Sequence, residues 1–356
     1  MQIGIAGAGV LGRLLAWCLS REGHAVTVID PASGPLGRGA AGWTAAGMLS
    51  PSAELECADL TVFQAGLDSI GMWGRIIASL PGAPDFDCHG SLLLAHRGDE
   101  GAAHHLVDLI EHKAPEGHRP QSMTIRDLTR LEPDIHGPAH AWMLPHEGAV
   151  NPVQLMQALC EGASGVHWLW NQSVDTVASG LLQTRDASSH KFDHVFDVRG
   201  LGQRPADGPG SGCAQVRGVR GEIFLLHAPE VALKRPIRLL HPRHRVYIVP
   251  RRDHHYIVGA SEIESEDRSP VSLRTTVELL SAAYSVLPGL AEARLIHTET
   301  NLRPALPDNL PLIEQAPGLT RINGLFRHGW MIAPAMVTKA LHGARIPAEL
   351  APAPAH

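Results

Sequence analysis

Three glycines near the start of the chain, Gly7, Gly9 and Gly12, stand between a strand-like run and a helical one. Residues 2–6 alternate in polarity as a strand does, whereas from residue 10 the apolar side chains recur with the spacing of one helical face. In such a unit the first glycine permits the tight turn, the second lets a pyrophosphate approach the backbone, and the third lets the helix pack closely. The helix N-terminus adds about +0.5 of a charge, which attracts phosphate. The pattern predicts a dinucleotide site at Gly7, Gly9, Val10, Leu11 and Gly12.

An acidic residue at the end of the next apolar run supports this interpretation. Residues 25–29 form a second strand-like run, and Asp30 follows it directly. A carboxylate at this place accepts hydrogen bonds from the ribose hydroxyls of adenosine and repels a 2′-phosphate. A glycine-rich turn also occurs in α/β proteins that bind no nucleotide, and this is the alternative interpretation.

The composition limits the class of protein. A chain of 356 residues favours two domains over one core. Its 30 Lys and Arg against 36 Asp and Glu give a net charge of −6, so we expect binding to neither nucleic acid nor an anionic membrane. The five cysteines include no CxxC pair, which favours reduced thiols in a cytoplasmic protein. We expect no signal peptide, no membrane-spanning run and, despite 22 histidines, no metal site.

A run of small residues from 37 to 48 favours FAD as the dinucleotide. Where side chains are missing, the backbone can lie against a large flat ligand, so this segment is suited to pass beneath a flavin and along its ribityl chain. The alternative is a flexible linker, but Trp43 and Leu49 would anchor the segment. The candidate flavin contacts here are Thr44, Ala45, Ala46, Gly47 and Met48.

Three later segments are expected to return to the same cofactor. Residues 195–198 form a strand-like run that ends before Gly200, and residues 171–177 form the strand before it, with Val174 placed to cover the adenine. A helix is expected from Gly329, and its positive end would stabilise the reduced flavin ring. The candidate contacts in this last segment are Arg327, His328, Gly329, Trp330, Met331 and Ile332.

The middle of the chain predicts antiparallel sheet. Short β runs at 221–227, 237–240, 246–250 and 256–260 are joined by polar turns. A helix is expected at 273–287, with its apolar stripe formed by Leu273, Val277, Leu280, Tyr284 and Leu287. The predicted fold is therefore α/β: a Rossmann-like FAD-binding domain of the glutathione-reductase type, and an α+β substrate domain with an antiparallel sheet.

Arg303 is the residue that we select for binding a substrate carboxylate. A guanidinium matches a carboxylate bidentately, and such a charge-assisted contact is worth about 1.5–3 kcal/mol. Arg303 follows a strand-like run and directly precedes the segment expected at the cofactor. Tyr247 is a second donor for the same carboxylate, with a core tyrosine as the alternative. No serine elbow or Cys/His pair is recognisable, which fits an enzyme whose cofactor carries the chemistry.

Several motifs together resemble the D-amino-acid oxidase superfamily, and within it the glycine oxidases of the ThiO type. They are GAGVLG at 7–12, GWTAAGML at 42–49, NPVQLMQAL at 151–159, VYIVPR at 246–251, LRPALPD at 302–308 and FRHGWMIAPA at 326–335. The resemblance implies FAD without a covalent bond, an FAD-binding domain at 1–85, 146–215 and 304–356, and a substrate domain at 86–145 and 216–303. It also implies that Arg303 and Tyr247 hold the carboxylate, and that Met48, His244 and Arg327 lie close to the reacting atoms.

The reaction that the resemblance implies is the oxidative deamination of a small amine or amino acid. A hydride passes from the carbon that bears the neutral amine to flavin N5, water hydrolyses the imine, and dioxygen reoxidises the flavin to give hydrogen peroxide. Glycine would yield glyoxylate and ammonia, and in thiamine biosynthesis the imine itself feeds the thiazole ring. Proximity and orientation dominate such catalysis, so no side-chain base is required.

Departures from the family pattern leave other hypotheses open. Asp30 stands where many relatives carry Glu, and residues 258–263 differ from the form expected for glycine. A second hypothesis is therefore an FAD-dependent oxidase or dehydrogenase of a larger N-substituted amino acid, and a third is a flavin-binding role without catalysis. No cysteine follows Cys213, which excludes a C-terminal cysteine–flavin bond. The tRNA-modifying members fit poorly because the net charge is −6. A homo-oligomer is compatible with the sequence.

Overall fold

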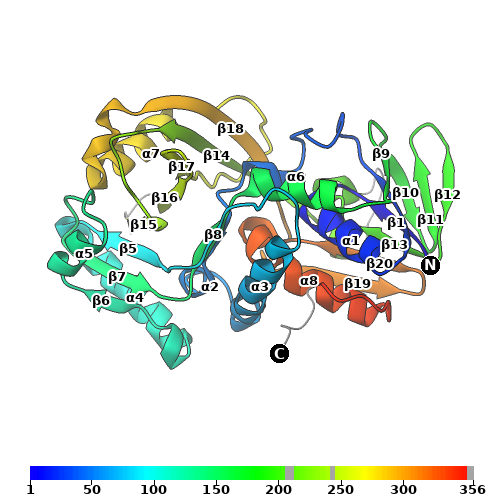
Figure 1. Cartoon of the computed structure of the whole chain (residues 1–356), viewed down its shortest axis with the longest axis horizontal. Helices are drawn as coiled ribbons and strands as arrows, with labels where there is room; N and C mark the ends of the chain where they lie inside the picture. The colour runs from blue at the N-terminus through cyan, green and yellow to red at the C-terminus, as the bar shows by residue number, and fades with distance from the viewer. Residues whose placement is uncertain (205–211, 241–244, 351–356) are drawn as a thin grey trace.

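The computed structural model describes residues 1–204, 212–240 and 245–350, and two large sheets dominate it (Figure 1). In Figure 1 the eight-stranded sheet lies on the left and the six-stranded sheet on the right, with α2, α3 and β8 between them. This middle region brings residues far apart in the chain to one place, and the functional site is built there.

The six-stranded sheet begins with the predicted strand–turn–helix unit. Strands β1 and β2 have the bounds expected from the sequence, and α1 (Val10–Arg21) begins at the predicted residue. All neighbours in this sheet are parallel except the β19–β20 pair, which is antiparallel. The strand order is β19 (Leu312–Ala316), β20 (Leu319–Asn323), β13 (His194–Asp197), β1 (Gln2–Ala6), β2 (Ala25–Ile29) and β9 (His167–Leu169).

Both faces of this sheet are covered. On one face α1 packs against α6 and α8, and α8 packs against α3, around a core that includes Ile3, Ile5 and Trp17. On the other face Val174 and Leu182 of a small antiparallel sheet contact Val195 and Leu319. The elements are α3 (Leu60–Ala78), α6 (Pro152–Gly162), α8 (Gly329–Gly343), β10 (Val174–Ala178), β11 (Leu181–Thr184) and β12 (Ser189–Lys191).

The expected strand at 171–177 is displaced in the structure. The strand begins at Val174, and it belongs to the small β10–β11–β12 sheet. The strand that extends the six-stranded sheet is β9, where Trp168 pairs with Val28. Three residues of irregular polarity are too short for periodicity to reveal a strand, because a period of two needs several repeats.

The eight-stranded sheet contains the predicted antiparallel meander. β15, β16, β17 and β14 are neighbours in this order, and only the β15–β5 pair is parallel. Val246 and Ile248 face the main core of this sheet, whereas Tyr247 and Val249 face the opposite side, as their alternation predicts. The order is β18 (Arg294–Ala305), β14 (Arg217–His227), β17 (His255–Gly259), β16 (Arg245–Arg251), β15 (Ile237–Leu240), β5 (Ser91–Ala95), β7 (His140–Leu144) and β6 (Gln121–Met123).

Helices and short strands complete the structure around this sheet. α4 contributes Ala103, Val107 and Ile110 to a core with β5 and β7. A second small sheet has the order β3–β8–β4, and β8 lies between the two large sheets in Figure 1. These remaining elements are α2 (Pro51–Glu54), α4 (Glu100–Lys113), α5 (Ile125–Leu131), α7 (Leu273–Val286), β3 (Met48–Leu49), β4 (Phe86–Asp87) and β8 (Gly148–Val150).

Helix α7 forms where predicted, but the apolar stripe assigned to it is wrong. Leu273 is 80% exposed, Val277 56% and Tyr284 52%, whereas Leu279 and Ala283 are buried against the sheet. Thr275 and small Ala283 lie on the buried face, so large apolar residues do not mark it. The stripe that looked most hydrophobic is largely the solvent face, and only Leu287, just after the helix, is fully buried.

The domain boundaries expected from the sequence stay a prediction, although the two sheets fall on either side of them. Strand β18 runs from the edge of the eight-stranded sheet toward the cofactor-binding segments, across the expected boundary at residue 304. Across the described ranges, no helix has the length and apolarity to cross a membrane. The same ranges contain no cluster of three or more His, Cys, Asp or Glu side chains that could hold a metal ion.

Gly12 provides a test of the strand–turn–helix unit. A Cβ at residue 12 would lie 1.8 Å from the carbonyl oxygen of Gly7, so α1 could not keep its distance from β1. We expect Gly12→Ala to lower the free energy of unfolding by about 3 kcal/mol or more. The measurement is urea unfolding beside Gly101→Ala, where a Cβ meets nothing within 4 Å. Equal midpoints for the two variants would contradict the close packing.

Candidate active site

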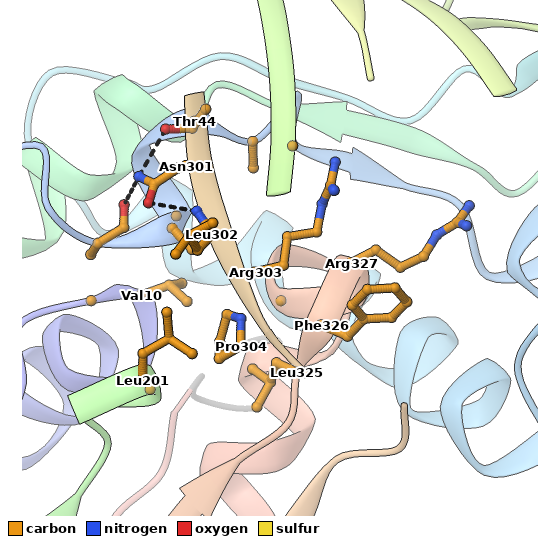
Figure 2. A pocket seen from close by; sticks show the side chains of 18 of the residues that line it. Val10, Thr44, Leu201, Asn301, Leu302, Arg303, Pro304, Leu325, Phe326 and Arg327 are labelled. Atoms are coloured by element: carbon orange, nitrogen blue, oxygen red, sulfur yellow. Dashed lines mark hydrogen bonds between the residues drawn. The ribbon is translucent and has the colours of Figure 1, made fainter. Parts of the chain in front are cut away.

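One cavity of about 1930 Å³ connects the two sheets. Its walls come from the turn after β1, the 39–48 segment, β10, the turn after β13, the C-terminal part of β18 and the start of α8. Figure 2 shows Val10 and Leu201 on one side of β18, and Arg303 and Arg327 extending toward the other. The cavity therefore extends from the glycine-rich turn after β1 to a region that several arginine side chains line.

The first end of the cavity has the geometry of a phosphate site. Gly7 has a φ of +105°, which glycine adopts without strain, and no side chain caps the N-terminus of the fully described helix α1. The first turn of α1 also lacks an acidic residue, so its backbone N–H groups are free for an anion. A Cβ added at Gly9 would meet only the Ala40 methyl within 4 Å, at 3.6 Å, so the backbone here is accessible from the cavity.

Asp30 is fixed beside this turn. One carboxylate oxygen accepts a hydrogen bond of 2.6 Å from the Ala8 N–H, and the other accepts one of 2.8 Å from the Ala32 N–H. Val174 lines the same end, and its carbonyl accepts a hydrogen bond of 2.8 Å from Arg199. Arg199 is itself paired with the buried carboxylate of Asp197. A ribose and an adenine placed here would meet a carboxylate and an apolar wall.

The segment of small residues lies along the middle of the cavity and is held from several sides. Asn301 donates hydrogen bonds to the Ala40 carbonyl (3.2 Å) and the Thr44 hydroxyl (3.0 Å), as Figure 2 shows. The indole of Trp330 donates to the Gly42 carbonyl at 2.9 Å, and Arg251 donates to the Ala46 carbonyl. The segment is therefore an ordered wall of the cavity. No local pattern in the sequence predicted this role for Asn301.

Most of the predicted cofactor contacts line this one cavity. Three do not: Gly12 faces the strand, and the side chains of His328 and Ile332 are buried behind the wall. His244 lies outside the described residues. The predicted residues that line the cavity are Gly7, Gly9, Val10, Leu11, Asp30, Thr44, Ala45, Ala46, Gly47, Met48, Val174, Gly200, Tyr247, Arg303, Arg327, Gly329, Trp330 and Met331.

Arg303 extends from β18 into the cavity, and few neighbouring groups offset the positive charge of its guanidinium. Its guanidinium donates to the carbonyls of Ser261 (3.0 Å) and Arg220 (3.4 Å), and no carboxylate of the described residues forms an ion pair with it. Burial lowers the pKa of Arg303, Tyr247 opposes this effect, and the positive charge of Arg327 adds to it. Gly221 leaves room for the Arg303 guanidinium, because a Cβ at residue 221 would lie 2.5 Å from it.

Tyr247 lies beside Arg303 on the neighbouring part of the sheet. Burial raises the pKa of the Tyr247 phenol, while the charges of Arg303 and Arg327 act in the opposite direction. The hydroxyl therefore keeps its proton at neutral pH and is available as a donor. A Cβ at Gly259 would lie 2.8 Å from this hydroxyl, so the small residue leaves room for the ring.

Glu54, at the end of α2, is a site residue that the sequence analysis missed. Its carboxylate contacts Arg238 of β15 at 2.8 Å, Arg327 at 2.9 and 3.1 Å, and His328 Nδ1 at 3.2 Å. Burial alone would raise the pKa of Glu54, but the charges of Arg327 and Arg238 and the contact with His328 outweigh it and hold the pKa well below its usual value. Its partners are distant in the chain, so no local spacing indicated the cluster.

Comparison with known proteins agrees with this geometry. Residues 2–338 match the family described as FAD dependent oxidoreductase, abbreviated DAO. The chain belongs to this family. FAD is thus the cofactor of this oxidoreductase, and the uncapped helix N-terminus, Asp30 and the ordered wall of small residues fit it.

Individual relatives refine the picture of this FAD-dependent oxidoreductase. A Rhizobium etli protein named for thiamine biosynthesis, the oxidoreductase ThiO, is 37% identical over 340 residues, covering 94% of each chain. Glycine oxidase from Geobacillus kaustophilus is 24% identical over 358 residues, and its crystal structure covers 99% of this chain and 97% of that one with a TM-score of 0.81. Iminodiacetate oxidase from Chelativorans has a TM-score of 0.80 at 24% identity, covering 98% and 96%. The predicted fold class is confirmed by these structures.

Glu54→Gln tests the buried cluster. Removing one partner of a buried ion pair leaves uncompensated charge, so we expect the free energy of unfolding at pH 7 to fall by about 3–5 kcal/mol. Because the folded pKa of Glu54 is lowered, its contribution is complete above the unfolded pKa of about 4.3 and disappears as pH falls through the folded value.

Urea unfolding at a series of pH values measures this effect. The difference between the wild-type protein and Glu54→Gln should shrink below about pH 4. Glu56→Gln, which removes the half-exposed contact with Arg245, should cost at most about 1 kcal/mol. A difference independent of pH would show that the Glu54 charge is not what stabilises the fold.

Proposed function

We propose that this enzyme oxidatively deaminates glycine or another small amino acid, with FAD as the electron acceptor and dioxygen as the final one. The observation that carries the proposal is Arg303, a guanidinium without a carboxylate partner among the described residues, in the cavity that the small-residue segment also lines. A half-buried arginine of this kind can bind a planar carboxylate through two parallel hydrogen bonds.

Arg303 and Tyr247 would hold the substrate by its carboxylate. The carbonyls of Ser261 and Arg220 orient the guanidinium, which leaves its remaining N–H groups for the ligand. The protonated Tyr247 hydroxyl adds a neutral donor from β16 of the same sheet. With the carboxylate fixed at two points, the carbon that bears the amine has a defined position, and such orientation supplies much of the rate.

Bound FAD supplies the acceptor for the two electrons that leave the substrate carbon. The protein residues position the amino acid, exclude bulk water and keep charge balanced around Arg327 through Glu54. The resulting imine is hydrolysed to the oxo acid and ammonia, which for glycine are glyoxylate and ammonia. The start of α8, at Gly329, directs its positive end toward the cavity.

A role in thiamine biosynthesis, by way of the thiazole ring, is part of the proposal. The support is the Rhizobium etli relative with its ThiO name and 37% identity. We further propose the domain division stated from the sequence, with the six-stranded sheet in the FAD-binding domain and the eight-stranded sheet in the substrate domain.

A larger N-substituted amino acid is the second candidate substrate. The cavity also extends to α7, where Arg274 and Thr275 line it. It is therefore not confined to the surroundings of Arg303. The fold shared with iminodiacetate oxidase is compatible with this substrate class and does not select it.

Arg303→Ala tests the carboxylate site. We expect the Michaelis constant for glycine to rise by about one to two orders of magnitude, because a charge-assisted contact of about 1.5–3 kcal/mol is lost. The measurement is the rate of peroxide formation in air over a series of glycine concentrations, with anaerobic bleaching of the flavin band as the check that glycine reduces the flavin. Arg126→Ala, at an exposed position of α5, is the matched control and should behave as the wild-type protein.

The outcomes separate the hypotheses. Unchanged kinetics in Arg303→Ala would remove the proposed carboxylate site. A wild-type flavin that glycine leaves oxidised, but that sarcosine or iminodiacetate bleaches, would move the substrate to the second candidate. A flavin that none of these reduces would contradict amino-acid oxidation.

A further inference from the structure

We infer that Glu262 binds the ammonium group of the arriving substrate, before that group loses its proton to water and the neutral amine is oxidised, so that the cavity selects zwitterions over simple carboxylates. The inference rests on the proposed function and deepens it, because it assigns the second charged end of the amino acid. It concerns a carboxylate that lines the same cavity as Arg303 and Arg327.

The backbone on both sides of Glu262 is fixed. Ile263 exchanges two backbone hydrogen bonds with Arg220, of 2.9 and 3.0 Å, and the Ser261 hydroxyl accepts one of 3.0 Å from the Glu222 N–H. The Ser261 carbonyl is the same group that accepts a hydrogen bond from Arg303. Glu262 therefore directly follows Ser261, whose carbonyl contacts Arg303. The pairing of Ile263 with Arg220 holds this segment in place.

Arg327 does not use up the charge of Glu262. Glu54 already contacts two nitrogens of Arg327, at 2.9 and 3.1 Å, whereas Glu262 contacts it through one oxygen at 3.3 Å. The Glu262 side chain is 42% exposed, compared with 9% for Glu54. The other oxygen of Glu262 forms no hydrogen bond or ion pair with the described residues and remains accessible to a ligand.

The charges favour a ligand that carries both signs. Arg303 attracts the carboxylate of the substrate, and the negative charge of Glu262 acts on Arg303 closely enough to oppose the lowering of its pKa. A simple carboxylate bound at Arg303 is repelled by Glu262, whereas an amino acid places an ammonium group next to its carboxylate and is attracted by both. Glu262 is therefore a specificity-determining residue.

Glu262→Gln tests the inference, because glutamine keeps the shape and an oxygen for Arg327 but removes the charge. We expect the dissociation constant for glycine to rise by about tenfold or more, and that for acetate to stay equal or to fall. Glycine affinity is obtained from the concentration dependence of anaerobic flavin reduction in the holoenzyme. Acetate affinity is obtained from the change that it causes in the oxidised flavin spectrum.

Glu264→Gln is the matched control. It lies two residues away, forms an ion pair of 2.9 Å with Arg217, and does not line the cavity. This variant should keep the wild-type ratio of glycine to acetate affinity. A Glu262→Gln variant with that same ratio, or one in which both ligands weaken equally, would overturn the inference and indicate a structural role through Arg327.

Failure of the proposed function gives a different result. If glycine does not reduce the wild-type flavin, oxidation of glycine is rejected, but the ratio is still measured from the spectral changes that bound glycine and acetate cause. A wild-type protein that binds acetate at least as tightly as glycine would then overturn the role of Glu262 separately.

Discussion

The carboxylate of Glu54 is the interaction on which the site depends. It lies at the end of α2 and contacts Arg238 on the eight-stranded sheet and Arg327 just before α8, which packs on the six-stranded sheet. A buried charge is tolerated only when it is paired and hydrogen-bonded, so the three segments must meet at this point in the folded protein. The cluster thereby fixes the distance between the cofactor-binding segments and the sheet that carries Tyr247.

Strand β18 contributes side chains to two parts of the cavity. Asn301 holds the wall of small residues through Ala40 and Thr44, and Arg303, two residues later, extends toward the part where we propose that the substrate binds. Residues two apart on a strand share a face, so both side chains leave β18 on the side of the cavity. The C-terminal part of β18, residues 301–304, lines the cavity.

The parts of the structure that local chemistry determines were predictable. The β1–α1–β2 unit follows from three glycines and the change of periodicity, and the meander follows from alternation in β15, β16 and β17. The stripe on α7 was wrong because the sheet packs against Ala283 and Thr275, and hydrophobicity alone did not reveal that surface. Glu54 was missed because its partners lie far away in the chain, and only the tertiary fold brings them together.

The continuity of β18 has a thermodynamic consequence. One rigid element touches the cofactor-side wall at Asn301 and the substrate-side cavity at Arg303. Any displacement of this strand that one ligand favours must alter the affinity for the other by an equal factor, because linkage between two binding equilibria is reciprocal. With the proposed role of Arg303, cofactor retention and substrate recognition are therefore coupled through the position of β18.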